Sequence, residues 1–88
     1  MDEKDLEKIL KALANKRRIL ILRVLKGRKK ASVNDLAKTI KLSFRSTSKH
    51  LSILYAAGIL DKEQSGLTVF YSIDPKPEKV ILHLLSII

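Results

Sequence analysis

Hydrophobic positions follow a helical period over most of the chain and change to a strand period after Gly58. The clearest helix lies between Ser43, which suits an N-cap, and Gly58, which suits the left-handed residue that ends a helix. Its apolar face is formed by Phe44, Thr47, Leu51, Leu54 and Tyr55. Its other face contains Arg45, Ser46, Lys49, His50 and Ser52. Because this second face is basic and has no carboxylate, it indicates a helix that lies against a polyanion.

Two helices are predicted near the start of the chain. Residues 2–13 form an amphipathic pattern with acidic residues in the first turn, where they complement the helix dipole. Asn15 can cap a second helix that runs to about Lys26 and ends at Gly27. This helix is apolar nearly all round, which places it at the centre of the domain. A buried strand is the alternative for so short an apolar run, but the cap and the glycine favour a helix.

A third, short helix precedes the basic one. Ser32 and Asp35 have the spacing of a capping box, and the apolar positions that follow continue to Ile40. Residues 41–43 then lead directly into the next helix. Two helices joined by a tight turn, the second with a basic outer face, form a helix-turn-helix motif over about 32–58.

A β-hairpin is predicted over about 59–73. Its strands are 59–64 and 67–73, and Ser65-Gly66 forms a two-residue turn in which glycine supplies a positive φ. Leu60, Val69, Tyr71 and Ile73 are expected on its buried face. A hairpin after a helix-turn-helix has the form of a wing.

The last helix is predicted over 77–88, with Pro77 and Glu78 in its first turn. It is too apolar to face water on any side. Together with the apolar stripe of residues 2–13, it has more apolar surface than one small core can cover, so both helices are expected to form a dimer interface. The expected interface residues are Leu6, Ile9, Leu10, Leu13, Val80, Ile81, Leu84, Leu85, Ile87 and Ile88.

Composition narrows the function. The 88 residues suit one domain, and 18 basic against 9 acidic residues give a net charge of +9, which favours a nucleic-acid partner. A lysine-rich surface of the kind found in heat-adapted proteins is the alternative. Aromatic residues, at 5%, are too few for a typical single-strand binder. The sequence has no signal peptide and no apolar run of membrane-spanning length, so we expect a cytoplasmic, nucleoid-associated protein without membrane contact.

Candidate DNA contacts follow from how a recognition helix enters the major groove, which is by its N-terminal part. Arg45 is the best candidate for bidentate reading of guanine, with a phosphate contact as the alternative. Thr47 faces more inward and suits packing better, and His50 either contacts phosphate or bonds within the domain. The wing is expected to have an auxiliary role in DNA binding. The basic loop 28–30 is either a solvated connection or a phosphate contact, and its charge alone does not decide between them. The expected DNA-binding set is Ser43, Arg45, Ser46, Thr47, Lys49, His50, Lys62 and Gln64.

Neither catalysis nor a cofactor is predicted. His50 and His83 have no acid pair or activated nucleophile near them in the sequence. The absence of cysteine excludes disulfides and thiolate metal sites. Glu78 and His83 are five residues apart and do not share a helix face, so no metal site is expected.

Short motifs in the same order resemble the ArsR-type winged-helix transcriptional regulators. They are Leu10–Asn15 with Arg18-Ile19, Ser32–Ala37, Leu42-Ser43, Ser48–Leu51 with Leu54, Ala57–Leu60 and Val69–Tyr71. The resemblance covers roughly residues 9–74. It implies a homodimer, formed by the first and last helices, that binds double-stranded DNA through two recognition helices.

The chain also departs from this family in three places. Metal sensors of the family usually carry a cysteine pair near the start of the helix that begins here at Ser32, and this chain has none. Another sensor type uses histidine and acidic pairs on the last helix, which here has only Glu78 and His83. Lys41 stands where a glycine often forms the turn.

The sequence therefore predicts an α+β, mainly α, winged helix-turn-helix over residues 1–88. The predicted function is a homodimeric, sequence-specific DNA-binding regulator that represses transcription without metal. Two other functions stay open, which are a winged-helix module for protein contacts in the transcription machinery and a low-specificity architectural protein. The operator, the regulated genes and any effector are not specified by the sequence.

Overall fold

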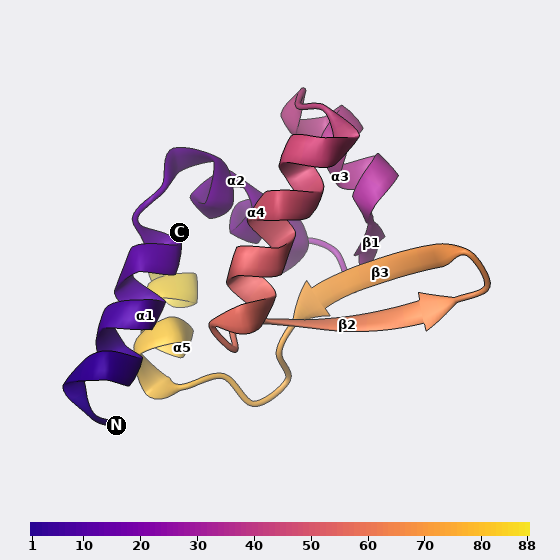
Figure 1. Cartoon of the computed structure of the whole chain (residues 1–88). Helices are drawn as coiled ribbons and strands as arrows, with labels where there is room; N and C mark the ends of the chain where they lie inside the picture. The colour runs from indigo at the N-terminus through magenta and orange to yellow at the C-terminus, as the bar shows by residue number, and fades with distance from the viewer.

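The computed structural model describes all 88 residues as five helices and a three-stranded antiparallel sheet (Figure 1). The helices are α1 (Glu3–Leu13), α2 (Lys16–Lys26), α3 (Val33–Ile40), α4 (Phe44–Ala56) and α5 (Lys79–Ile87). The strands are β1 (Ala31–Ser32), β2 (Leu60–Ser65) and β3 (Thr68–Ile73). The predicted winged helix-turn-helix is confirmed, with α3 and α4 as the motif and β2 and β3 as the wing. Each helix is too short or too polar to cross a lipid bilayer.

Local side-chain caps fix where the central helices begin. Asn15, Ser32 and Ser43 each accept a hydrogen bond from a backbone N–H in the first turn of α2, α3 and α4. Each cap of this kind contributes about 1 kcal/mol. Lys41 ends α3 in the left-handed region, with φ 58° and ψ 47°, so the turn is made without glycine. Gly58 has φ 76°, as expected of the residue that ends α4.

The core surrounds α2, which contacts α1, α3, α4, α5 and β3. Ile21, Leu22 and Leu25 of α2 are buried. The prediction that this helix lies at the centre is therefore confirmed, although Leu20 on its outer side stays exposed.

The sheet differs from the predicted two-stranded wing in having a third strand. Ala31 pairs with Tyr71 and Ser32 pairs with Phe70, so β1 lies beside β3. A strand of two residues has no period that a sequence pattern can display. Its pairing ties the base of the wing to the start of α3.

The hairpin turn lies one position later than predicted. Ser65 pairs with Thr68, so Gly66-Leu67 forms the turn, and Gly66 has φ 62°. A positive φ at the first turn position suits a type II′ turn, which favours glycine there. The shift moves each cross-strand partner by two residues, so the predicted faces are kept, with Leu60 opposite Ile73.

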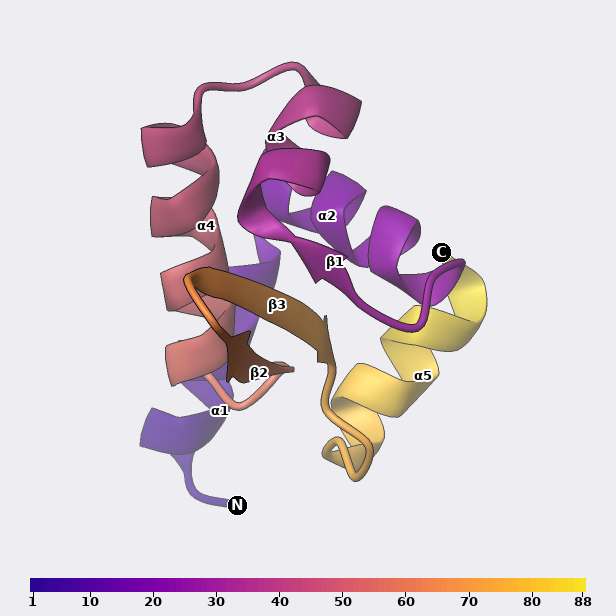
Figure 2. The same cartoon turned by 90° about the vertical axis from the view of Figure 1, so that its right-hand side faces the viewer.

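Helix α5 starts two residues later than predicted, because Glu78 is extended, with φ −57° and ψ 151°. Figure 2 shows α5 beside α2, on which its buried Ile81 and Leu85 pack. Leu82 and Ile87 on its other side are exposed. The single chain therefore leaves part of this apolar helix uncovered, and its covering by a second copy stays a prediction.

Candidate nucleic-acid interface

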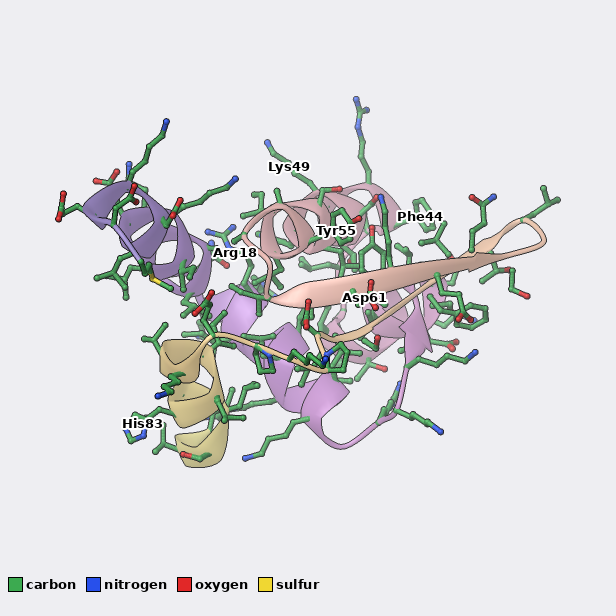
Figure 3. All side chains as sticks on the ribbon, turned by 90° about the horizontal axis from the view of Figure 1, so that it is seen from below. Arg18, Phe44, Lys49, Tyr55, Asp61 and His83 are labelled. Carbon is green, nitrogen blue, oxygen red and sulfur yellow. The ribbon has the colours of Figure 1, made fainter.

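Helix α4 presents its basic residues on the side opposite the core. Leu51 and Leu54 are fully buried, whereas Arg45, Lys49 and Ser52 are exposed. Figure 3 shows Lys49 pointing away from the body of the molecule. Neither Arg45 nor Lys49 forms an ion pair in the chain, and no carboxylate occurs between residues 36 and 60. Both cations are thus free to meet an external anion.

The N-terminus of α4 has a fixed backbone. The Ser43 hydroxyl accepts from the Ser46 N–H at 3.1 Å, and the Thr47 hydroxyl donates to the Ser43 carbonyl at 2.8 Å. Thr47 is fully buried, so it cannot contact DNA, and its place in the predicted DNA-binding set is corrected to packing. Ser43 and Ser46 remain exposed beside Arg45.

Two aromatic residues assigned to the apolar face of α4 are exposed instead. Phe44 is 56% exposed and Tyr55 also faces solvent. Both lie at the edge of the buried strip, on the side of α4 that faces the wing (Figure 3). Spacing alone placed them in the core because three- and four-residue steps do not show how wide the buried strip is.

His50 lies on the opposite edge of α4 and bonds within the domain. Its Nδ1 lies 3.2 Å from Nη1 of Arg18, whose Nε donates to the Ala12 carbonyl at 2.6 Å. Arg18 thereby links the C-terminal end of α1 to α4 (Figure 3). A guanidinium only donates, so Nδ1 accepts and the neutral ring carries its proton on Nε2.

Burial, followed by the charges of Arg18, Arg17 and Lys49, lowers the pKa of His50 below 6.5. Of the two roles that the sequence allows for His50, a phosphate contact or a bond within the domain, the structure shows Nδ1 bonded within the domain. The partner, Arg18, is not predictable from the sequence, because a contact between residues 32 positions apart has no local signal.

The cations on and beside the wing have partners inside the chain. Nζ of Lys62 lies 4.4 Å from the centre of the Tyr55 ring. Nζ of Lys30 lies 3.5 Å from Oε1 of Glu63 and 4.8 Å from the centre of the Phe70 ring. The Gln64 side chain donates to the carbonyl of Gly66 at 3.2 Å. Lys62 and Gln64 would have to leave these contacts to reach DNA.

A groove of about 420 Å³ lies between part of α4 and the wing. Its walls include Phe44, Ser48 and Tyr55 from α4 and Lys62, Gln64 and Val69 from the wing. Phe44 therefore stays more than half exposed although it faces the wing. Two lining residues of the groove, Phe44 and Ser48, directly precede Arg45 and Lys49 in the sequence.

The predicted dimer residues divide into two groups. Ile9, Leu13, Ile81 and Leu85 are buried within the single chain, so they are corrected to core residues. Leu6, Leu10 and Ile87 are exposed, whereas Val80, Leu84 and Ile88 are half-buried. Leu82 is also exposed and was not in the predicted set. Helices α1 and α5 both lie at the end of the molecule away from the wing tip (Figure 1).

No three histidine, cysteine, aspartate or glutamate side chains gather where they could hold a metal ion. His83 is exposed on α5, whereas His50 belongs to α4. The site therefore offers cations, hydroxyls and two exposed aromatic rings, Phe44 and Tyr55.

Comparisons with known proteins agree with this geometry. Residues 15–62 match the family described as "Bacterial regulatory protein, arsR family". The chain is 35% identical over 77 residues to the transcriptional activator HlyU of Vibrio cholerae, covering 88% of this chain and 70% of that protein. The structure of reduced HlyU from Vibrio cholerae superposes with a TM-score of 0.80 at 28% identity, over 96% of this chain and 84% of HlyU.

The same fold occurs in a solved DNA-binding domain from Mycobacterium bovis. That fragment of Mb0332, described as a homodimeric winged helix-turn-helix, has a TM-score of 0.82 at 24% identity. The match covers 96% of this chain and 74% of the fragment.

Proposed function

Because the chain belongs to the ArsR family of bacterial regulatory proteins, we propose that it is a homodimeric repressor of a pseudo-palindromic DNA site. The chain is a winged helix-turn-helix transcriptional regulator and not an enzyme. The observation that supports DNA reading by α4 is the pair of exposed cations, Arg45 and Lys49, which have no partner within the chain.

Each residue of the proposed interface has a separate role. Arg45 reads a guanine in the major groove, because it lies in the first turn of α4. Lys49 and Ser46 contact base edges or phosphate. The backbone N–H groups beside Ser43 hold a phosphate at the helix N-terminus. Because Nδ1 of His50 is bonded to Arg18, only its Nε2 can contact DNA. Lys62 and Gln64 have auxiliary roles.

The proposed dimer uses α1 and α5. Leu6, Leu10, Leu82 and Ile87 expose apolar surface that a second copy can cover. The description of Mb0332 as homodimeric agrees with this arrangement. A two-fold dimer would place two α4 helices against half-sites roughly 34–36 Å apart, one turn of DNA.

Repression requires only that the bound dimer exclude polymerase from its site. HlyU is described as an activator. That this chain represses transcription, and does not activate it, is therefore itself part of the proposal. We place the protein on the cytoplasmic nucleoid, where bacterial DNA lies. No metal takes part in the proposal, since the sequence has no cysteine and no ligand cluster is present.

Selection of bound duplexes from random DNA, at a stated salt concentration, tests the proposal. We expect a pseudo-palindrome that is preferred about 10³-fold or more over random sequence. A reporter gene behind that site should be repressed by the protein. Equal affinity for all duplexes would contradict the proposal and favour an architectural protein, whereas no DNA binding would favour a module for protein contacts.

The dimer has its own test. Replacing Leu82 and Ile87 together with Glu should give monomers in sedimentation at micromolar concentration, because both side chains are outside the core. Replacing exposed Lys26 with Glu in α2 is a control for the added charge. A wild-type protein that sediments only as a monomer would contradict the dimer.

A further inference from the structure

Phe44 is a large aromatic side chain that is not part of the hydrophobic core cluster. It is the first residue of α4 and is 56% exposed. The groove of about 420 Å³ separates it from the facing side of the wing. The chain has only one other phenylalanine, Phe70, and that ring is half-buried under Lys30. Packing within the chain therefore covers less than half of Phe44.

The backbone around Phe44 is held in place. Ser43 caps the helix immediately before it, and buried Thr47 donates to the Ser43 carbonyl. Phe44 precedes Arg45, so their side chains leave neighbouring sides of the same helical turn. Figure 3 shows Phe44 on the side of α4 that faces the wing. Phe44 thus has a defined position beside the proposed guanine-reading residue.

A phenylalanine ring cannot read the hydrogen-bonding groups of base edges, because it has no polar atom. The apolar group that base pairs present in the major groove is the C5-methyl of thymine, and phenylalanine is one of the side chains that contact it. Resting on the proposed function, in which the N-terminal part of α4 enters this groove, we infer that Phe44 reads a thymine methyl. It does so at one base pair of each half-site, next to the pair read by Arg45.

The test removes the methyl group and nothing else. Each thymine of the selected site is replaced in turn by deoxyuridine, which keeps the base-pairing and groove hydrogen-bonding groups. The wild-type protein should bind about fourfold more weakly when the thymine opposite Phe44 in one half-site is replaced, the effect of losing roughly one buried methyl contact. Replacement in both half-sites should multiply the two losses.

Variants assign the effect to Phe44. Phe44→Ala should bind the thymine and deoxyuridine duplexes equally at that position, whereas Phe44→Leu should keep part of the discrimination. Leu67→Ala is the matched control, because Leu67 is also an exposed apolar residue but lies at the wing tip, and it should keep the full ratio. The comparison on wild-type protein needs no variant, so poor folding of Phe44→Ala would not prevent the test.

Two results would overturn the inference. They are equal wild-type affinity for thymine and deoxyuridine at every position of a preferred site, and an unchanged ratio in Phe44→Ala. Either result leaves the regulator intact, because the site is still preferred. A wild-type protein without preference for any duplex would instead remove the proposed function and this inference together.

Discussion

The cations of α4 and the cations of the wing region are the same kinds of residue in different situations. Arg45 and Lys49 extend from α4 without an ion pair, whereas Lys62 lies over the Tyr55 ring and Lys30 lies between Glu63 and a second ring. The net charge of +9 does not distinguish the two regions. We therefore predict the DNA-binding face from the cations that have no partner in the chain, and not from the total charge.

The contacts of the wing cations are individually weak, but each would have to be broken before its cation could bind a phosphate. A cation–π contact at an exposed site is worth about 0.5–1 kcal/mol, and an exposed ion pair contributes roughly 0–1 kcal/mol. Lys62 would lose the first on moving to a phosphate, and Lys30 would lose both. The α4 cations lose nothing comparable, so we expect them to dominate both affinity and sequence preference.

Arg45→Ala should produce the largest effect. Loss of a bidentate guanine contact should cost about 1–3 kcal/mol on the preferred site and relax the preference at one base pair of each half-site. The measurement is the affinity for the selected and a scrambled duplex, each over a salt series. If both affinities fall equally, Arg45 only anchors the helix, and the reading of sequence shifts to neighbouring residues or to DNA shape.

Lys49→Ala should have a smaller and less selective effect. If Lys49 contacts a phosphate, every sequence should bind more weakly and the salt slope should fall by about 0.9. Lys30→Ala is the matched control, because Lys30 already has partners in Glu63 and Phe70, and it should leave the salt slope nearly unchanged. Equal slope changes in the two variants would show that a partner within the chain does not keep a cation from DNA.

Lys62→Gln should affect the fold more than DNA binding. It removes the contact with Tyr55, which should lower the free energy of unfolding by about 0.5–1 kcal/mol in urea titration. The same loss should be absent in a Tyr55→Leu background, where the ring is already gone. If Lys62→Gln lost more DNA affinity than Lys49→Ala, the wing would contribute more to DNA binding than Lys49 of α4.

Local chemistry explains which parts of this structure are predictable from the sequence. Asn15 and Ser43 act through groups one to three residues away, so their caps follow from the sequence. The short strand β1, the bond between Arg18 and His50, and exposed Phe44 depend on segments that are distant in the chain. Only the assembled fold specifies those pairings, and these distant contacts decide which side chains near α4 are free.

His50 should give the smallest effect of the residues compared here. It tests whether a basic residue on α4 that already has a partner in the chain differs from Arg45 and Lys49, which have none. Arg18 donates to its Nδ1, and burial and the charges of Arg18, Arg17 and Lys49 lower its pKa in the folded chain. As the pH falls through 6.5, the unfolded chain takes up a proton that the folded chain resists, so the free energy of unfolding should decrease. This decrease should continue until the pH is below the folded pKa, where both states are protonated.

His50→Gln, whose amide oxygen can still accept from Arg18, should lack this contribution when both proteins also carry His83→Gln. Urea titrations between about pH 5 and pH 7.5 measure the difference. A wild-type protein that gains stability relative to His50→Gln as the pH falls would mean that the ring favours its charged form. Its Nδ1 would then be free of Arg18, and His50 would join Arg45 and Lys49 as an available cation.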